Sequence, residues 1–219
     1  GGQNTIARFD GTNTNLGMDD GIVITTATVQ NNGDGPHGPN NSDNSGTDNG
    51  SGGNNLLNNL TTEPTYNASV LELDFVPSND TVSFNFIFGS EEYPEYVCSD
   101  FNDVFAFFIS GPNPDGGNFN NKNIALIPGT NTPILINNVN SGQAGSAGSP
   151  GGCPAGGLSN SQYYVDNSNG NTIQYDGFTQ VLTALSKVEC GETYHLIIAI
   201  ADVGDGIYDS GIFLEANSL

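Results

Sequence analysis

Short apolar stretches with a two-residue repeat recur along this chain, and helix signals are nearly absent. In residues 70–76 and 81–88, Leu, Val and Phe alternate with polar residues, which is typical of half-buried strands in an antiparallel sheet. Residues 104–110 and 196–201 are almost continuously apolar, as expected for central strands covered on both faces. With Gly, Asn and Pro turns between strands, the pattern predicts an all-β fold, an antiparallel two-sheet sandwich of jelly-roll type. The predicted strands are residues 21–29, 70–76, 81–88, 104–110, 134–139, 178–185, 193–201 and 207–216.

The length of 219 residues allows one sizeable β domain, and we expect a single sandwich over residues 1–219. Two long Asn/Gly-rich loops, residues 31–62 and 141–160, interrupt the strands; such loops are usually functional or disordered. In the first loop, Asp43 and Asp48 are candidate cation ligands, although the EF-hand spacing is not met. A flexible loop that needs no ion is an equally good interpretation.

The charge balance restricts the partners. Only 3 Lys and Arg residues face 24 Asp and Glu residues, for a net charge of -21, which disfavours nucleic acid and anionic membrane surfaces. The sequence has no apolar run long enough for direct membrane insertion, and its first ten residues lack signal-peptide features, so we expect a mature or trimmed chain. Bound cations would relieve the self-repulsion, and adaptation to a salty habitat is the alternative explanation.

An acidic loop follows the strand predicted at 81–88. Its sequence, GSEEYPEYVCSDFND, places six oxygen-bearing side chains in thirteen residues, including Glu95. Carboxylates at this density repel one another, and a divalent cation removes the conflict. We therefore predict calcium ligands here; the alternative is that Glu91 and Glu92 bind backbone amides at a turn. The predicted ligands in this loop are Glu91, Glu92, Asp100, Asn102 and Asp103.

A second acidic loop, ADVGDGIYDSG, contains Asp202, Asp205 and Asp209. Its glycines permit the positive φ angles of a tight connection. These three Asp residues would complete the calcium site if both loops lie at the same end of the sandwich. In a purely structural interpretation, they cap turn amides instead.

Four blocks of the sequence carry a family resemblance. They are FGSEEYPEYVCSDFNDVFAFFISGP, NIALIPGTNTP, YDGFTQVLTA and YHLIIAIADVGDGIYDSGIFLEANS. In this order they resemble the choice-of-anchor L domains, which are extracellular modules of large surface and secreted proteins, mostly from Bacteroidota. The resemblance implies an extracellular or cell-surface location. It also implies that relatives carry one or two further strands, often with a Cys, ahead of the point where this chain begins.

The chain has three cysteines, Cys98, Cys153 and Cys190, so a single disulfide leaves one cysteine outside the pair. In an oxidising compartment two of them would pair, and no spacing matches a CxxC metal or redox site. The sequence leaves the pairing open. The odd cysteine is then a free thiol, a partner of another chain or a residue whose partner lies outside this sequence.

Signs of an enzyme are few. His37 and His195 are the only histidines, and no GxSxG, HExxH or Cys-His pattern occurs. Glu91 and Glu92 are adjacent, so on a strand they would point to opposite faces, unlike a glycosidase pair. We expect no catalytic activity.

These observations predict an extracellular, calcium-stabilised binding or adhesion module of a cell-surface or secreted protein, with a glycan or protein at a cell surface as partner. The alternative is a structural subunit of an extracellular filament or sheath, which binds copies of itself by strand exchange at an open sheet edge.

Overall fold

The computed structural model describes residues 4–29, 35–42 and 46–218. These residues form eleven strands and three single-turn 3-10 helices, so the predicted all-β class is confirmed. The strands are β1 (Ile6–Asp10), β2 (Asp20–Thr25), β3 (Thr65–Phe75), β4 (Thr81–Ser90), β5 (Val104–Pro112), β6 (Asn118–Asn123), β7 (Tyr164–Asp166), β8 (Gly177–Thr179), β9 (Leu182–Lys187), β10 (Tyr194–Val203) and β11 (Ser210–Glu215). The 3-10 helices are η1 (Leu57–Asn59), η2 (Pro150–Gly152) and η3 (Ser161–Tyr163).

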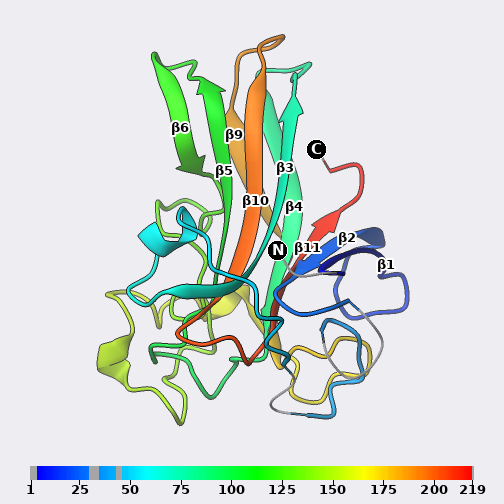
Figure 1. Cartoon of the computed structure of the whole chain (residues 1–219), viewed down its shortest axis with the longest axis vertical. Helices are drawn as coiled ribbons and strands as arrows, with labels where there is room; N and C mark the ends of the chain where they lie inside the picture. Colours follow the sequence, from blue (N-terminus) through cyan, green and yellow to red (C-terminus); the bar gives the residue numbers. More distant parts are fainter. Residues whose placement is uncertain (1–3, 30–34, 43–45, 219) are drawn as a thin grey trace.

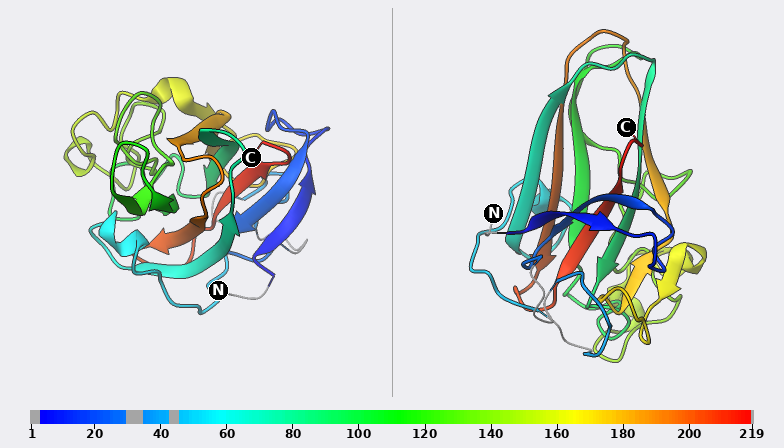
Figure 2. Two further views of the ribbon diagram at one scale, coloured as in Figure 1. Left: turned by 90° about the horizontal axis from the view of Figure 1, so that it is seen from above. Right: turned by 90° about the vertical axis from the view of Figure 1, so that its right-hand side faces the viewer.

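Two antiparallel sheets pack face to face, which confirms the predicted sandwich (Figures 1 and 2). The seven-stranded sheet has the order β1-β2-β11-β4-β8-β7, and β9 also pairs with β4. The four-stranded sheet has the order β3-β10-β5-β6. The chain therefore passes from one sheet to the other between β4 and β5 and again between β10 and β11. Residues at these two connections form the acidic site.

Phenylalanines fill the space between the sheets. On β4, Phe84, Phe86 and Phe88 all point inward and are buried, as the alternating pattern predicts. They meet Phe105 and Phe107 of β5, with ring centroids between 4.9 and 5.5 Å apart. Burial of one such side chain contributes about 1.5–3 kcal/mol, so this aromatic layer holds the two sheets together.

The central strands of the smaller sheet are covered on both faces. β10 pairs with β3 on one side and β5 on the other. Val104, Ala106 and Phe108 face away from the aromatic layer and pack under Leu57 of η1 and Leu135. Because both faces of β5 and β10 are packed, their sequences are continuously apolar and do not alternate with polar residues.

The predicted strand at 134–139 is wrong. Its apolar residues are buried as expected, but the backbone turns there, and Val139 N donates to Leu135 O. Asn side chains bind backbone groups of this segment in place of a partner strand: Asn102 Oδ1 accepts from Asn137 N, and Asn140 Nδ2 donates to Ile136 O. Side-chain amides of this kind compete with sheet formation.

Several strand boundaries also differ from the prediction. The stretch 178–185 divides into β8 and β9, both paired with β4. The first and last predicted strands are shorter, since β2 ends at Thr25 and β11 starts at Ser210. The strands β1, β6 and β7 were not predicted; β6 is largely polar because it is an edge strand with partly exposed side chains.

The long loops gather at one end of the sandwich, the lower end in Figure 1. A disulfide joins Cys98 to Cys153 and so ties the acidic loop after β4 to the loop at 141–160. Backbone hydrogen bonds from Gly145 N to Val97 O and from Ala147 N to Glu95 O strengthen the same link. Cys190 is the free cysteine, and it is exposed near the start of β10.

Candidate metal centre

The sheet register brings the two acidic loops together. Ser90 at the end of β4 pairs with Ser210 at the start of β11, so Glu91 and Asp209 are neighbours, and Glu91 N donates to Asp209 O at 3.0 Å. Likewise Val104 pairs with Ala201, which places Asp103 beside Asp202. Both loops thus lie at the same end of the sandwich, as the two-loop hypothesis requires.

Five carboxylates at this end are buried and form what we call the acidic cluster. Each exposes no more than 2% of its surface, and Asp205 lies beside them partly exposed. The members are Glu91, Glu92, Asp103, Asp202 and Asp209. Such burial is unusual, because a charged carboxylate is stable in a protein interior only when hydrogen bonds or a counter-charge replace its hydration.

Two of the predicted ligands lie elsewhere. Asp100 is exposed, and Asn102 is half-buried with its Oδ1 accepting a hydrogen bond from Asn137 N at 2.8 Å. Both line a neighbouring pocket. Glu91 and Glu92 follow β4 in a turn, so the expectation that they point to opposite faces of a strand is wrong for this pair, and both side chains are buried.

Hydrogen bonds satisfy part of the acidic cluster. Asp103 Oδ1 accepts from Val203 N at 2.9 Å, and its Oδ2 accepts from Ser210 Oγ at 2.6 Å. Both oxygens of Asp209 accept from Thr47 N, at 3.3 and 3.2 Å. The cluster therefore joins β5, β10 and β11 to the first long loop.

Other buried oxygens of the site accept no hydrogen bond from the described residues. They are Glu92 Oε2, Asp202 Oδ1 and the amide oxygen of Asn67. Asn67, on β3, donates through Nδ2 to Asp202 Oδ2 and to Gly206 O, both at 3.1 Å. A buried acceptor without a partner costs about 1–3 kcal/mol, more when charged, so these three atoms mark a place where a ligand is favourable.

The pKa values of the acidic cluster are raised. Burial, and then the charges of Asp103, Asp205, Asp202 and Glu91, raise the pKa of Glu92 to about 11. Burial raises the pKa of Asp103 to about 7 although Ser210 and Val203 stabilise its ionised form by hydrogen bonds. Burial, followed by the charge of Asp103, raises the pKa of Asp202 well above its usual value. Without a counter-ion the cluster therefore retains protons at neutral pH.

No basic side chain compensates this charge. The three Lys and Arg residues of the chain lie in strands: Arg8 in β1, Lys122 in β6 and Lys187 in β9. Arg8 lies 3.9 Å from Asp20, and Lys122 lies over the ring of Phe119. Within the described residues, these three side chains form no ion pair with Glu92, Asp103 or Asp202, so protons or a cation would balance the charge of those three carboxylates.

The donor set suits a hard cation, since all its atoms are oxygens of carboxylates and of one amide. In the described ranges, no three Asp, Glu, His or Cys side chains stand at the spacing of a metal-ligand set. Asp48 lies at the edge of the site, next to Gly206. Its Oδ1 would be 3.3 Å from a Cβ atom added to that glycine. Asp43, the other candidate in that loop, lies outside the described residues.

Sequence reasoning missed Asn67, Thr47 and Ser210. Thr47 and Ser210 carry no pattern that separates them from the many other hydroxyl residues of the chain. Asn67 gives a weak signal, because Asn is disfavoured inside a strand; it lies within β3 at a φ of 50°, in the left-handed region. Reaching Asp202 from that position requires the β3–β10 pairing, which only the structure supplies.

Fold and site together define an all-β sandwich module with a buried acidic cluster at its loop end. The family model of the choice-of-anchor L domain matches residues 1–219, and the chain belongs to this family. Searches of curated proteins and of solved structures found no match. Family membership points to an extracellular, surface-associated module. Among the described residues, no helix has the length and apolarity needed to cross a membrane.

Proposed function

We propose that this protein is a calcium-stabilised, non-catalytic binding or adhesion module at the cell surface. The observation that supports it most is the acidic cluster, in which the buried atoms Glu92 Oε2 and Asp202 Oδ1 accept no hydrogen bond from the described residues. A divalent cation would replace the missing counter-charge. The ordered loops around it would then present a binding surface to a glycan or protein.

Calcium fits this donor set better than other common metals. It accepts six to eight oxygen ligands in irregular geometry, whereas magnesium requires a near-ideal octahedron and zinc favours His and Cys. The site offers only oxygens. The proposed ligands are Glu91, Glu92, Asp103, Asp202, Asp205, Asp209 and Asn67, while Asp100 and Asn102 are left out because they line the neighbouring pocket.

Calcium bound here would fix the loop end of the sandwich. The cluster side chains come from the ends of four strands, and Thr47 N of the first long loop binds Asp209. Loops held only by backbone turns open easily, and a shared cation opposes that opening. The proposal thus assigns calcium a structural role, which a melting experiment measures directly.

The test is thermal unfolding with excess calcium, with magnesium and with a chelator. At calcium about 100 times its Kd, the native state gains roughly 2.7 kcal/mol, or about 5–10 °C in Tm for a chain of this size. Glu92→Gln and Asp202→Asn should raise the Tm in chelator, because a neutral amide replaces a carboxyl that must take up a proton when the chain folds without a cation. Both should reduce the gain from calcium. Asp115→Asn, an equal charge change at an exposed turn, is the matched control and should alter neither value.

An unchanged Tm on calcium addition, with pre-bound metal ruled out by elemental analysis, would overturn the proposal. So would an equal response of Asp115→Asn and Glu92→Gln, because general screening and not a site would then explain the gain. If magnesium raised the Tm as much as calcium does, the site would bind divalent cations without a preference for calcium.

A filament subunit remains the second candidate. Within the described residues, the edge of β3 opposite β10 makes no strand pair from Ser69 to Phe75. An apolar groove of about 310 Å³ opens beside it between the sheets, lined by Leu71, Leu73 and Leu214. A strand from a second copy would fit this edge. The charge of -21 opposes association of copies, so we favour the module; calcium-dependent polymers in size-exclusion chromatography or negative stain would reverse that preference.

A further inference from the structure

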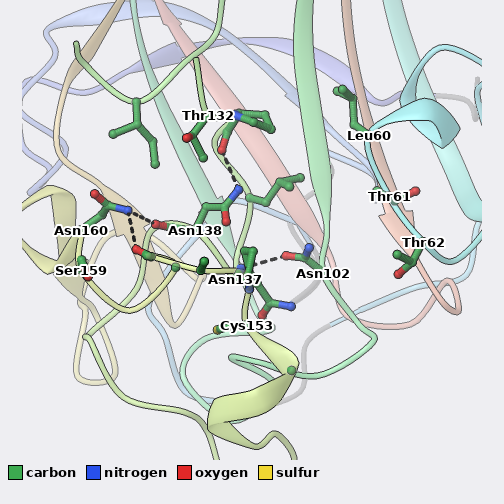
Figure 3. Close-up of a pocket in the computed structure, with 18 of the residues that line it drawn as sticks. Leu60, Thr61, Thr62, Asn102, Thr132, Asn137, Asn138, Cys153, Ser159 and Asn160 are labelled. Carbon is green, nitrogen blue, oxygen red and sulfur yellow. Dashed lines mark hydrogen bonds between the residues drawn. The ribbon is translucent and has the colours of Figure 1, made fainter. Parts of the chain in front are cut away.

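A second site lies beside the acidic cluster, at the same end of the sandwich. It is a pocket of about 810 Å³ between the turn at 60–62, the segment 127–138 and the segment 152–160 (Figure 3). Small-molecule sites usually measure roughly 300–1,000 Å³, so a ligand of several rings fits. Neither the fold nor the proposed calcium site explains why this pocket exists.

Neutral polar residues and apolar residues share the pocket wall. Five asparagines and six Ser or Thr residues line it, and of the described residues there Asp100 alone is charged. Apolar side chains, for example Leu60, Ile127 and Pro133, supply slightly more of the wall surface than the polar groups do, and none of the described lining residues is aromatic. The pocket therefore offers hydrogen-bonding groups next to apolar surface, with Asp100 as its one charged group among the described residues.

Hydrogen bonds hold the amide side chains in fixed positions. Asn138 is 4% exposed; its Nδ2 donates to Pro133 O at 2.9 Å, while its Oδ1 accepts no bond from the described residues. Asn160 Nδ2 donates to Asn138 O at 2.8 Å and so joins two lining residues of the pocket (Figure 3). The disulfide at Cys153 fastens the third wall. A wall ordered before binding loses little entropy when a ligand enters.

We infer that this pocket binds a neutral saccharide. A sugar ring carries hydroxyls that donate and accept at once and also apolar C–H groups, and a wall that mixes hydroxyl and amide side chains with apolar ones matches both. The charge of -21 and Asp100 at the rim disfavour an acidic glycan. A wholly apolar ligand would take polar groups of the wall, such as the hydroxyls of Thr132 and Ser159, away from water without a hydrogen bond in return, at a cost for each. This inference rests on the proposed binding function and names its ligand class.

The pocket and the acidic cluster share part of their framework. Asn102 lines the pocket, and the next residue, Asp103, belongs to the acidic cluster. Val203 also lines the pocket, and its N–H donates to Asp103 Oδ1. Calcium at the cluster would order this shared wall, so we expect tighter saccharide binding in calcium than in chelator.

The test is calorimetric titration, in calcium, with neutral oligosaccharides of glucose, galactose, mannose and N-acetylglucosamine, and with oligogalacturonate as the acidic comparison. At least one neutral series should bind and oligogalacturonate should not. Thr132→Trp places a large side chain at the pocket rim, where Thr132 is exposed, and should weaken binding about tenfold or more (Figure 3). Thr193→Trp, an exposed position next to β10 outside the pocket, is the matched control and should bind as the wild type does.

A second pair of variants tests the polar wall. Asn131→Leu keeps the side-chain size and removes an exposed amide of the wall, so it should weaken binding; Asn118→Leu, an exposed amide on β6 outside the pocket, should not. Failure of every neutral sugar to bind overturns the inference. Binding that survives Thr132→Trp also overturns it, because the site then lies elsewhere. The calcium melting curve of the same samples reports separately on the proposed calcium site.

Discussion

The aromatic layer and the acidic cluster are buried to the same degree, yet their energetics are opposite. Phe86 and Asp103 both expose 0% of their surface. The aromatic layer is stabilising by itself, since its burial removes apolar area from water. The acidic cluster is costly until protons or a cation neutralise it. Burial alone therefore does not show whether a region stabilises the fold; for the acidic cluster the answer depends on the solution.

Position in the sheets explains this difference. The phenylalanines lie within paired strands, where the alternation of the chain points them inward. The carboxylates lie at strand ends, where the chain crosses from one sheet to the other. Side chains at such crossings need not follow the alternation, so polar groups become buried there without disrupting a sheet.

The largest effect should come from the aromatic layer. Phe86→Ala should lower the free energy of unfolding by about 3–5 kcal/mol, because it leaves a cavity against Phe105 and Phe107. Urea unfolding should give the same loss in calcium and in chelator. Leu185→Ala, on the exposed face of β9, should cost far less. If the loss of unfolding free energy depended on calcium, the aromatic layer would not be independent of the acidic cluster.

A smaller effect should appear as a reversed pH dependence. In chelator, Asp103 has a raised pKa of about 7 in the folded state, against 3.8 for its usual value, so the native state binds more protons than the unfolded state between these values. Stability should then fall as the pH rises from about 5 to about 8, by one to a few kcal/mol. With calcium the sign should reverse, because protons compete with the cation. Urea unfolding across this range, with and without calcium, measures both slopes; parallel slopes would contradict a metal at the cluster.

The smallest expected effect concerns Asn67. Asn67→Gly keeps the positive φ but removes the amide that contacts Asp202 and Gly206, so calcium affinity should fall about three- to tenfold, near 1 kcal/mol. Asn121→Gly has the same φ of 50° on β6 and is the matched control, which should leave calcium affinity unchanged. Calorimetric titration with calcium gives both values. Equal losses in the two variants would assign the effect to the backbone and not to the site.

The sequence predicted the parts of the fold that hydrophobic periodicity governs. β4 alternates and β5 is continuously apolar, and both were recognised for physical reasons that the structure bears out. β6 was missed because an edge strand with polar, partly exposed side chains has no such signal. The segment 134–139 was misread because buried apolar residues do not need a strand when Asn side chains bind the backbone, as Asn102 and Asn140 do here.

The candidate site was predicted in part. Residue type and density identified both acidic loops, and the register of β4 with β11 and of β5 with β10 brings them together. The number of acidic residues in a loop does not show where each side chain lies, however. Asp103 is buried in the acidic cluster, while Asp100 and Asn102 line the pocket. Asn67 lies far away in the sequence, and only the pairing of β3 with β10 makes it a neighbour of Asp202.

The scarcity of basic residues, all three of them within strands, also bears on how long such a module survives outside a cell. Proteases of the trypsin type cut after Lys or Arg in exposed, flexible loops. Here both long loops, residues 31–62 and 141–160, lack Lys and Arg altogether. Arg8, Lys122 and Lys187 lie in hydrogen-bonded strands, where cleavage first requires local unpairing. The loop end that carries the acidic cluster and the pocket is thus the part of the molecule that trypsin-like enzymes are least able to degrade.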